Sequence, residues 1–159
     1  MNNDTLSKVL KLLIIGLAIS GLVIYLFIFP FIGKSFIEVL PEASSWYWPW
    51  LSFSWITGIP CFMVLILMWQ FTSTIKDNKV FSRLNATRIL NISKLSILDT
   101  IIVIIGNLIL LFVDKNHPSI MILMLAIILL GITIAIIAYA FSRLIYNAAI
   151  LQEESDLTI

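Results

Sequence analysis

The sequence predicts an all-α integral membrane protein with four transmembrane helices, on two observations. Of its 159 residues, 60% are hydrophobic and only 12% are charged, whereas soluble domains are about half apolar and about a quarter charged. The apolar residues also gather into four long runs separated by more polar segments. A chain this short has too little interior to bury so much apolar surface, so the lipid bilayer is the solvent that fits it.

Each crossing needs roughly 20 apolar residues. The first run begins with Lys8 and Lys11, as a signal peptide would, but residues 27–31 lack the small side chains of a cleavage site. We therefore expect a retained first helix in a single membrane domain, 1–159. The predicted spans are about 9–29, 51–71, 95–113 and 119–141.

Residues 31–50 separate the first two spans, and Pro41 and Pro49 argue against a continuous helix there. Trp46, Trp48 and Trp50 stand directly before the second span. Aromatic side chains in that position anchor helices at the level of the lipid headgroups. An aromatic cage for a ligand is the alternative interpretation of this cluster.

The loop 72–94 is the most polar stretch, and Ser82 is a candidate N-cap within it. No proline or glycine occurs between Asn78 and Ile105. A helix should therefore begin at Ser82 and run through the third span to Val113. At 1.5 Å per residue it would be about 48 Å long, which exceeds a hydrocarbon core of about 30 Å.

The fourth span follows a five-residue connection, so it should pair antiparallel with the third. Pro118 suits the first turn of the fourth helix, where its missing N–H costs nothing. Helical spacing of apolar residues continues past the span to about Gln152, before an acidic run. Helices three and four are thus both predicted to extend into the cytoplasm, the fourth within a tail at 142–159.

The basic residues predict this orientation. Eight of them lie in the segments that would share one side of the membrane, and only Lys34 and Lys115 lie on the other. Short cytoplasmic loops carry the excess of lysine and arginine. We therefore predict that both termini and the loop 72–94 are cytoplasmic.

Three polar residues of the third span are intramembrane candidates: Asp99, Ser96 and Asn107. Placing a carboxylate in hydrocarbon costs much free energy, so the presence of Asp99 there suggests a function. It could carry a proton or bind a cation. The alternative is a structural carboxylate near the headgroups, satisfied by water or by Lys8 or Lys11 of the first helix.

Asp99 also belongs to a heptad seam along the third helix, typical of a helix–helix face. Internal packing against span four is one interpretation of it; a face that meets a second copy or a cytoplasmic partner is the other. Gly131 and Ala135 of span four fit the small-xxx-small pattern of close packing. The seam consists of Asn85, Ile89, Ile92, Ser96, Asp99, Val103, Gly106 and Leu110.

The loop 72–94 has a formal charge of +4 and the tail from Arg143 has −2. These opposite charges suggest that the tail docks on the loop, although the loop could also attract anionic lipid. Direct nucleic-acid binding is not expected, because topology explains the basic charge. The candidates for partner contacts are Phe81, Arg83, Asn85, Arg88, Glu153, Glu154, Asp156 and Leu157.

Catalytic chemistry has little support in the sequence. Cys61 and His117 are the single cysteine and histidine, which leaves no zinc-type ligand set and no Ser/His/Asp set. We therefore expect no catalytic residues, no metal site, no cofactor and no enzyme activity.

Two stretches carry a family resemblance. The segment Asn78-Lys79-Val80-Phe81-Ser82-Arg83-Leu84-Asn85 and the ending from Asn147 to Asp156-Leu157-Thr158-Ile159 resemble the domain-of-unknown-function 2975 family (DUF2975, YoaS-like). The resemblance implies a four-helix protein of the bacterial inner membrane without an assigned activity. It also implies a helix-turn-helix regulator as a cytoplasmic partner, because members are often encoded beside one.

These features give two functional hypotheses. The first is a sensor or anchor that sequesters a helix-turn-helix transcription regulator through the loop and the tail. The second is a small transporter or immunity-type protein that acts within the bilayer around Asp99.

Overall fold

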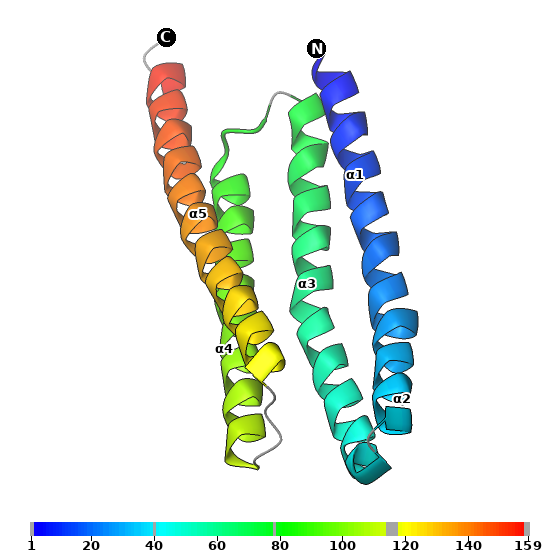
Figure 1. Ribbon diagram of the computed structural model, residues 1–159. Helices are drawn as coiled ribbons and strands as arrows, with labels where there is room; N and C mark the ends of the chain where they lie inside the picture. Colours follow the sequence, from blue (N-terminus) through cyan, green and yellow to red (C-terminus); the bar gives the residue numbers. More distant parts are fainter. Residues whose placement is uncertain (1, 40, 78, 114–117, 158–159) are drawn as a thin grey trace.

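The computed structural model describes residues 2–39, 41–77, 79–113 and 118–157, and the regular structure in these ranges is helical throughout (Figure 1). Within these ranges, four helices are long and apolar enough to cross a membrane. The predicted set of four long apolar helices is therefore confirmed. Their bounds are Asn3–Val39, Ser44–Lys76, Arg83–Phe112 and Ile120–Ser155.

The first helix changes its winding midway. α1 (Asn3–Val23) passes into a π-helical turn, η1 (Ile24–Ile28), and continues as α2 (Phe29–Val39). The helix thus runs well past residue 29, where we predicted the end of the first span. Pro30 does not end it, because the wider π turn directly before the proline relieves the clash of the ring with the preceding turn.

The connection to the second long helix is a 3-10 helix, η2 (Pro41–Trp46), so the predicted break in 31–50 is confirmed. α3 (Tyr47–Lys76) then begins inside the aromatic cluster. Pro49 falls in its first turn, where a missing N–H costs nothing. Pro60 lies in the middle of the helix.

α4 (Arg83–Phe112) begins and ends within one residue of the predicted bounds, Ser82 and Val113. Ser82 is its N-cap: the backbone of Ser82 is extended, and its hydroxyl oxygen accepts a hydrogen bond from the backbone N–H of Asn85 at 3.3 Å. The 30 residues make a rod of about 45 Å.

α5 (Pro118–Leu157) has 40 residues and is about 60 Å long. Pro118 is its first residue, as predicted. The predicted end near Gln152 is wrong, because the helix continues through the acidic run to Leu157. Glutamate is a good helix former, and the run contains no glycine or proline, so negative charge alone does not end a helix.

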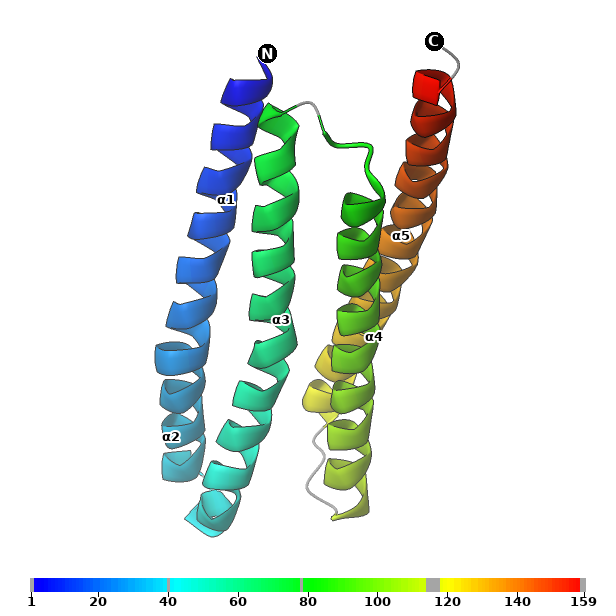
Figure 2. The same ribbon diagram turned by 180° about the vertical axis from the view of Figure 1, so that it is seen from behind.

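The long helices stand in an open row in chain order (Figures 1 and 2). α1 packs against α3, α3 against α4, and α4 against α5. Among the described residues, the backbone of α1 approaches neither α4 nor α5. The middle helices, α3 and α4, therefore each have two neighbours and the outer ones have one.

Both termini and the α3–α4 connection lie at the same end of the row (Figure 1). We call it the terminal end and define it as the described residues of the three segments 2–11, 72–88 and 142–157. α2 and the start of α3 lie at the opposite end (Figure 1). This arrangement agrees with an even number of crossings.

α4 presents polar and small residues of the predicted seam to α3. Asn85 Nδ2 donates to Thr74 Oγ1 at 2.7 Å, and Asp99 contacts a residue of α3 that is described below. A Cβ atom on Gly106 would collide with the ring of Phe53. The prediction that the seam packs against span four is therefore wrong for these members, which face the helix before α4 and not the one after it.

A different stripe of α4 meets α5. Ser93 Oγ donates to the carbonyl of Ala135 at 2.7 Å, and Ser142 Oγ of α5 donates to the carbonyl of Ala86 at 2.7 Å. Ile89 and Ile92, the isoleucines of the seam, lie between the face of α4 that meets α3 and the face that meets α5. They belong to a core cluster formed by α4 and α5. The buried members of that cluster are Ala86, Ile89, Ile92, Ala138 and Ile145.

Candidate functional site

Asp99 lies at the middle of the row, where α4 faces α3. Its Oδ2 atom accepts a hydrogen bond from Cys61 Sγ at 3.8 Å, and Tyr25 OH donates to the same sulfur at 3.9 Å. Three successive long helices thus contribute one polar group each to a line across the row. Both bonds are long and thiols are weak partners, so the carboxylate is held loosely.

The second carboxylate oxygen of this residue, Asp99 Oδ1, is buried, and among the described side chains it has no hydrogen-bond partner. A buried charged oxygen without a partner is costly. An acid in this position suits a group that takes up a proton or receives a cation.

The structure does not pair Asp99 with the first helix, which corrects the expectation that Lys8 or Lys11 satisfies it. Lys8 Nζ lies 4.0 Å from Asp4, one turn back on its own helix. Lys11 Nζ lies over the ring of Trp69, 5.1 Å from its centre. Both cations are therefore engaged near the terminal end, away from the carboxylate.

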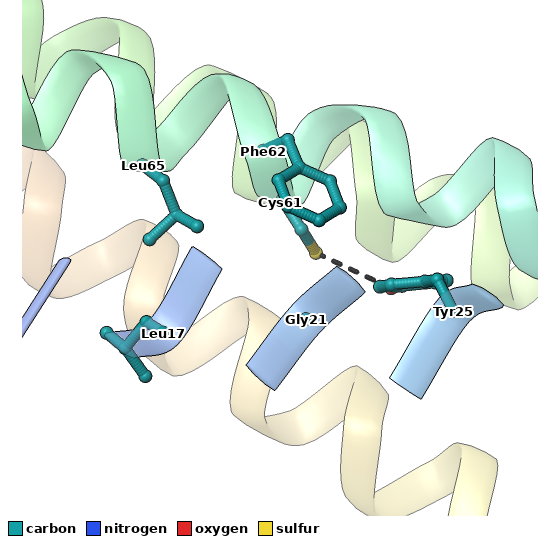
Figure 3. A pocket seen from close by; sticks show the side chains of 6 residues that line it. All are labelled: Leu17, Gly21, Tyr25, Cys61, Phe62 and Leu65. Carbon is teal, nitrogen blue, oxygen red and sulfur yellow. Dashed lines mark hydrogen bonds between the residues drawn. The ribbon is translucent and has the colours of Figure 1, made fainter. Parts of the chain in front are cut away.

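A cavity of about 200 Å³ lies beside this polar line, between α1 and α3 (Figure 3). Tyr25 and Cys61 supply its polar groups, and the remaining lining is apolar. Gly21 forms part of its wall, and a Cβ there would lie 3.2 Å from the ring of Phe62. This small cavity lies next to the Tyr25–Cys61 pair, and its volume is below the range of about 300–1,000 Å³ typical of small-molecule sites.

The position of Tyr25 depends on the π turn. In η1 the N–H of Phe29 bonds to the carbonyl of Ile24, five residues back. In the same pattern, the carbonyl of Tyr25 would accept a hydrogen bond from the N–H of residue 30. That residue is a proline, which has no N–H. Trp55 of α3 replaces the missing donor, since its Nε1 donates to that carbonyl at 3.0 Å.

The other intramembrane candidates are less open to a ligand. Ser96 Oγ donates to the carbonyl of Ile92 in its own helix at 3.0 Å. Asn107 lies about three turns beyond Ser96 along α4 and is half-buried. In the described part of the chain, no three His, Cys, Asp or Glu side chains gather closely enough to hold a metal ion.

Asn85 is the hub of the terminal end and is fully buried, with 0% of its surface exposed. Its Nδ2 donates to Thr74 Oγ1 and to the carbonyls of Lys79 and Val80, all within 3.0 Å. Its Oδ1 accepts from Arg88 Nη1 at 2.9 Å. Asn85 therefore fixes the α3–α4 connection from the inside, and its side chain is not on the surface where a partner contact needs it.

Arg83 and Glu153 join the start of α4 to the end of α5. Arg83 Nη2 lies 2.6 Å from Glu153 Oε2, and Arg83 Nε lies 3.1 Å from Oε1, so the pair is bidentate. The guanidinium also lies 6.0 Å from the ring centre of Tyr146. The predicted contact between the basic loop and the acidic tail is present at this pair.

The remaining partner-contact candidates differ in their accessibility. Phe81 is exposed, with 56% of its surface accessible. Arg88 turns inward to Asn85, and Glu154 is exposed. Asp156 and Leu157 end α5, but their side chains lie outside the described residues.

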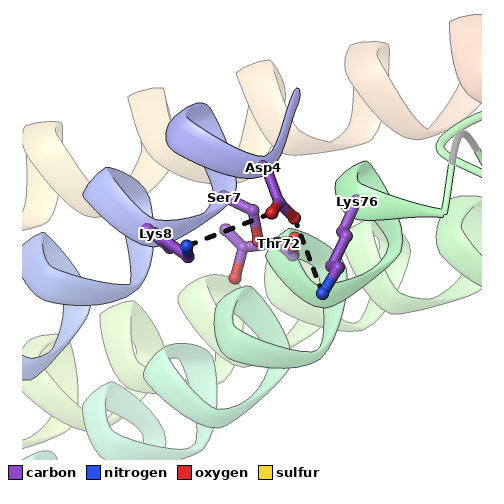
Figure 4. Close-up of polar contacts among 5 residues, drawn as sticks. All are labelled: Asp4, Ser7, Lys8, Thr72 and Lys76. Carbon is purple, nitrogen blue, oxygen red and sulfur yellow. Dashed lines mark hydrogen bonds and ion pairs between the residues drawn. The ribbon is translucent and has the colours of Figure 1, made fainter. Parts of the chain in front are cut away.

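A polar clamp between α1 and α3 has no counterpart in the sequence predictions (Figure 4). Ser7 Oγ donates to the carbonyl of Thr72 at 2.9 Å, and both residues are buried. Asp4 lies 3.6 Å from Lys76 and 4.0 Å from Lys8. The sequence shows that Asp4 stands one turn before Lys8 at the start of the first helix. It does not show that Lys76 of α3, 72 residues further along the chain, is the other partner of Asp4.

The three tryptophans predicted as interface anchors lie at the end opposite the termini. Trp48 is exposed, whereas Trp46 and Trp50 are half-buried. The ring of Trp50 contacts Phe29 edge-on, with the ring centres 5.9 Å apart. Trp50 thus also packs the first helix against α3, a role beyond that of an anchor.

Comparisons with known proteins agree with this architecture. The family model described as "Protein of unknown function (DUF2975)" matches residues 34–159. The chain is 24% identical over 152 residues to the "Uncharacterized membrane protein YoaS" of Bacillus subtilis (strain 168), over 94% of this chain and 95% of that protein. No solved structure matches it. The molecule is thus a multi-span membrane protein, and because the family model covers well over half of the chain, it belongs to the DUF2975 family.

Proposed function

We propose that this protein is a non-enzymatic bacterial membrane anchor or sensor that holds a helix-turn-helix transcription regulator at its terminal end. The observation that carries the proposal is the joined surface of α4 and α5. The bidentate Arg83–Glu153 pair connects the two helices there. Leu84 and Leu151 lie within two residues of this pair and are exposed, so apolar and charged contacts are offered together.

The lengths of the helices support this choice of surface. α4 and α5 are about 45 Å and about 60 Å long, against a hydrocarbon core of about 30 Å. The Ser142–Ala86 hydrogen bond sets α5 alongside the start of α4. The following residues, up to Leu157, extend α5 by about 22 Å.

The side of the membrane is part of the proposal. The terminal end carries lysines and arginines on all three of its segments, whereas Lys34 and Lys115 belong to the other side. The excess of basic residues in short loops marks the cytoplasmic face. We therefore assign the terminal end to the cytoplasm of the bacterial inner membrane, where a DNA-binding protein could be held. An alkaline phosphatase reporter fused after His117 should be active and one after Lys79 inactive; the reverse pattern would overturn the assignment.

The test of capture is co-purification of the regulator from native membranes with tagged protein. Glu153→Arg should lower recovery because two cations then face each other, and adding Arg83→Glu should restore it because the pair is reversed. Lys34→Glu, a charge change at the opposite end, is the control. Equal recovery from wild type, the Glu153→Arg variant and a chain truncated after Leu151 would contradict capture by this surface.

A second candidate function acts within the bilayer, and the unpartnered Asp99 Oδ1 favours it. In this case the protein is a small transporter or immunity-type protein that uses the carboxylate for a proton or a cation. Asp99→Asn keeps the shape and removes the charge. With membrane abundance held equal, loss of the cellular phenotype in this variant and its retention in the Glu153→Arg variant would favour the second function over the first.

A further inference from the structure

A second cavity, of about 420 Å³, lies between α4 and α5 and is lined by apolar side chains that are exposed at the surface of the row. Its volume falls within the range of about 300–1,000 Å³ typical of small-molecule sites. Its walls are isoleucines that are half-exposed, and a tyrosine closes one end. These wall residues are Ile97, Ile101, Ile104, Ile132, Ile136 and Tyr139.

The floor of this groove exists because small residues let the two helices approach. Ala135 is almost fully buried at the contact, and a Cβ on Gly131 would collide with the hydroxyl of Thr100. The hydroxyls of Ser93 and Thr100, on the floor of the groove, already donate to backbone carbonyls. Ser93 donates to the carbonyl of Ala135, and Thr100 donates to the carbonyl of Ser96, both at 2.7 Å. The floor of the groove therefore offers its occupant apolar contacts.

The groove is long and runs along the helices. The Ser93–Ala135 bond sets these two residues at one level. Tyr139 lies about one turn from this level toward the terminal end, and Ile104 lies about three turns from it toward the opposite end. The groove between them is therefore about 22 Å long. This exceeds the half-thickness of the hydrocarbon core, about 15 Å, so a whole acyl chain can lie in it.

One mouth of the groove is basic. Arg143 is one turn beyond Tyr139 toward the terminal end, and its Nε donates to Tyr139 OH at 3.3 Å, with the guanidinium 5.7 Å from the ring centre. Unlike Arg83, Arg143 has no carboxylate within ion-pair distance among the described residues. Lys94, exposed on α4 next to Ser93, is a second cation about one turn further from the terminal end than Tyr139. A fixed positive charge thus stands where an apolar groove reaches the level of the headgroups.

We propose that the α4–α5 groove is a binding site for an anionic phospholipid, with one acyl chain between the isoleucines and the phosphate at Arg143. Basic pockets between membrane helices bind anionic headgroups, at about 1 kcal/mol per basic residue near the surface. A soluble phosphate compound lacks the chain that the apolar walls select, and a zwitterionic lipid cancels the attraction to Arg143. This site goes beyond the proposed function and does not depend on it, since neither Arg83 nor Glu153 takes part.

The test is native mass spectrometry of the full chain in detergent, with phosphatidylglycerol, phosphatidylcholine of the same chains and glycerol phosphate added in turn. We expect bound phosphatidylglycerol, weaker phosphatidylcholine and no glycerol phosphate. Arg143→Gln should weaken the binding of phosphatidylglycerol about fivefold, whereas Lys79→Gln, the same charge change elsewhere at the terminal end, should leave it nearly unchanged. Equal binding of both lipids, or equal effects of the two variants, overturns the proposal.

The position of the chain is tested separately. Phosphatidylglycerol with a photoreactive group on its acyl chain should label peptides that contain residues 97–104 and 132–139. Ile136→Trp, which fills the groove without touching a charge, should abolish this labelling in protein that keeps its wild-type helical content. Labelling spread evenly over the outer faces of α1 and α5 would indicate bulk lipid and overturn a specific site.

Discussion

The indole Nε1 of Trp55 donates a hydrogen bond to the carbonyl oxygen of Tyr25 across 3.0 Å. That carbonyl is the one that Pro30 leaves without a donor in the π register of η1. A side chain of α3 therefore completes the backbone of the neighbouring helix, and it does so next to the Tyr25–Cys61–Asp99 line.

Trp55→Phe should destabilise the protein by about 1 kcal/mol, because the Tyr25 carbonyl then lacks a partner inside the membrane. Unfolding in detergent mixtures, followed by circular dichroism, measures the change. Pro30→Ala restores a backbone N–H at residue 30. The double variant should therefore lose less stability than the sum of the single variants; strict additivity would mean that Trp55 does not replace the donor.

Asn85→Leu should cost about 2–3 kcal/mol of unfolding free energy, because the carbonyls of Lys79 and Val80 lose the donor that fully buried Asn85 supplies and Arg88 loses its acceptor. The same change at exposed Asn91 of α4 is the matched control and should be nearly neutral. The same unfolding measurement applies. Equal stability of the two variants would show that the α3–α4 connection does not depend on Asn85.

Gly106→Ala should be destabilising by about 1–3 kcal/mol, since the new methyl group meets the ring of Phe53. Gly16→Ala, with nothing within 4 Å of the added Cβ, should instead stabilise its helix by up to about 1 kcal/mol. Adding Phe53→Leu to the first variant should recover part of the loss. A neutral Gly106→Ala would contradict the tight α3–α4 contact.

The Arg83–Glu153 pair should hold the end of α5 against α4 without adding much global stability, because both side chains are more than half exposed. Spin labels at Leu84 and Leu151, in a Cys61→Ala background, report the separation of the helix ends. Glu153→Arg should broaden the distance distribution, and the reversed pair should narrow it again. High salt should broaden the wild-type distribution, since it screens exposed charges.

Features that depend on neighbouring residues in the sequence could be predicted. The cap at Ser82 and the start of α5 at Pro118 follow local rules of helix initiation, and the structure confirms both. The end of α5 could not be read from the acidic run, because Glu153 and Glu154 favour helix as strongly as the residues before them.

Features that depend on which helices meet could not be predicted in the same way. The heptad spacing identified the buried face of α4 but not the helix that covers it. A lysine of the first helix was one of the partners considered for Asp99, yet α3 stands between α1 and α4, and its Cys61 donates to the carboxylate. The groove at Ile97 and Ile136 needs the separation of two helices, which no local pattern contains.

The open row in chain order also bears on how the protein is made. Because α3 packs on α1, α4 on α3 and α5 on α4, each new span finds its docking surface in the span that entered the bilayer just before it. No helix has to be inserted between two that are already joined. Contacts between consecutive segments close short loops and form quickly. The order in which the helices are synthesised is therefore also an order in which they can pack.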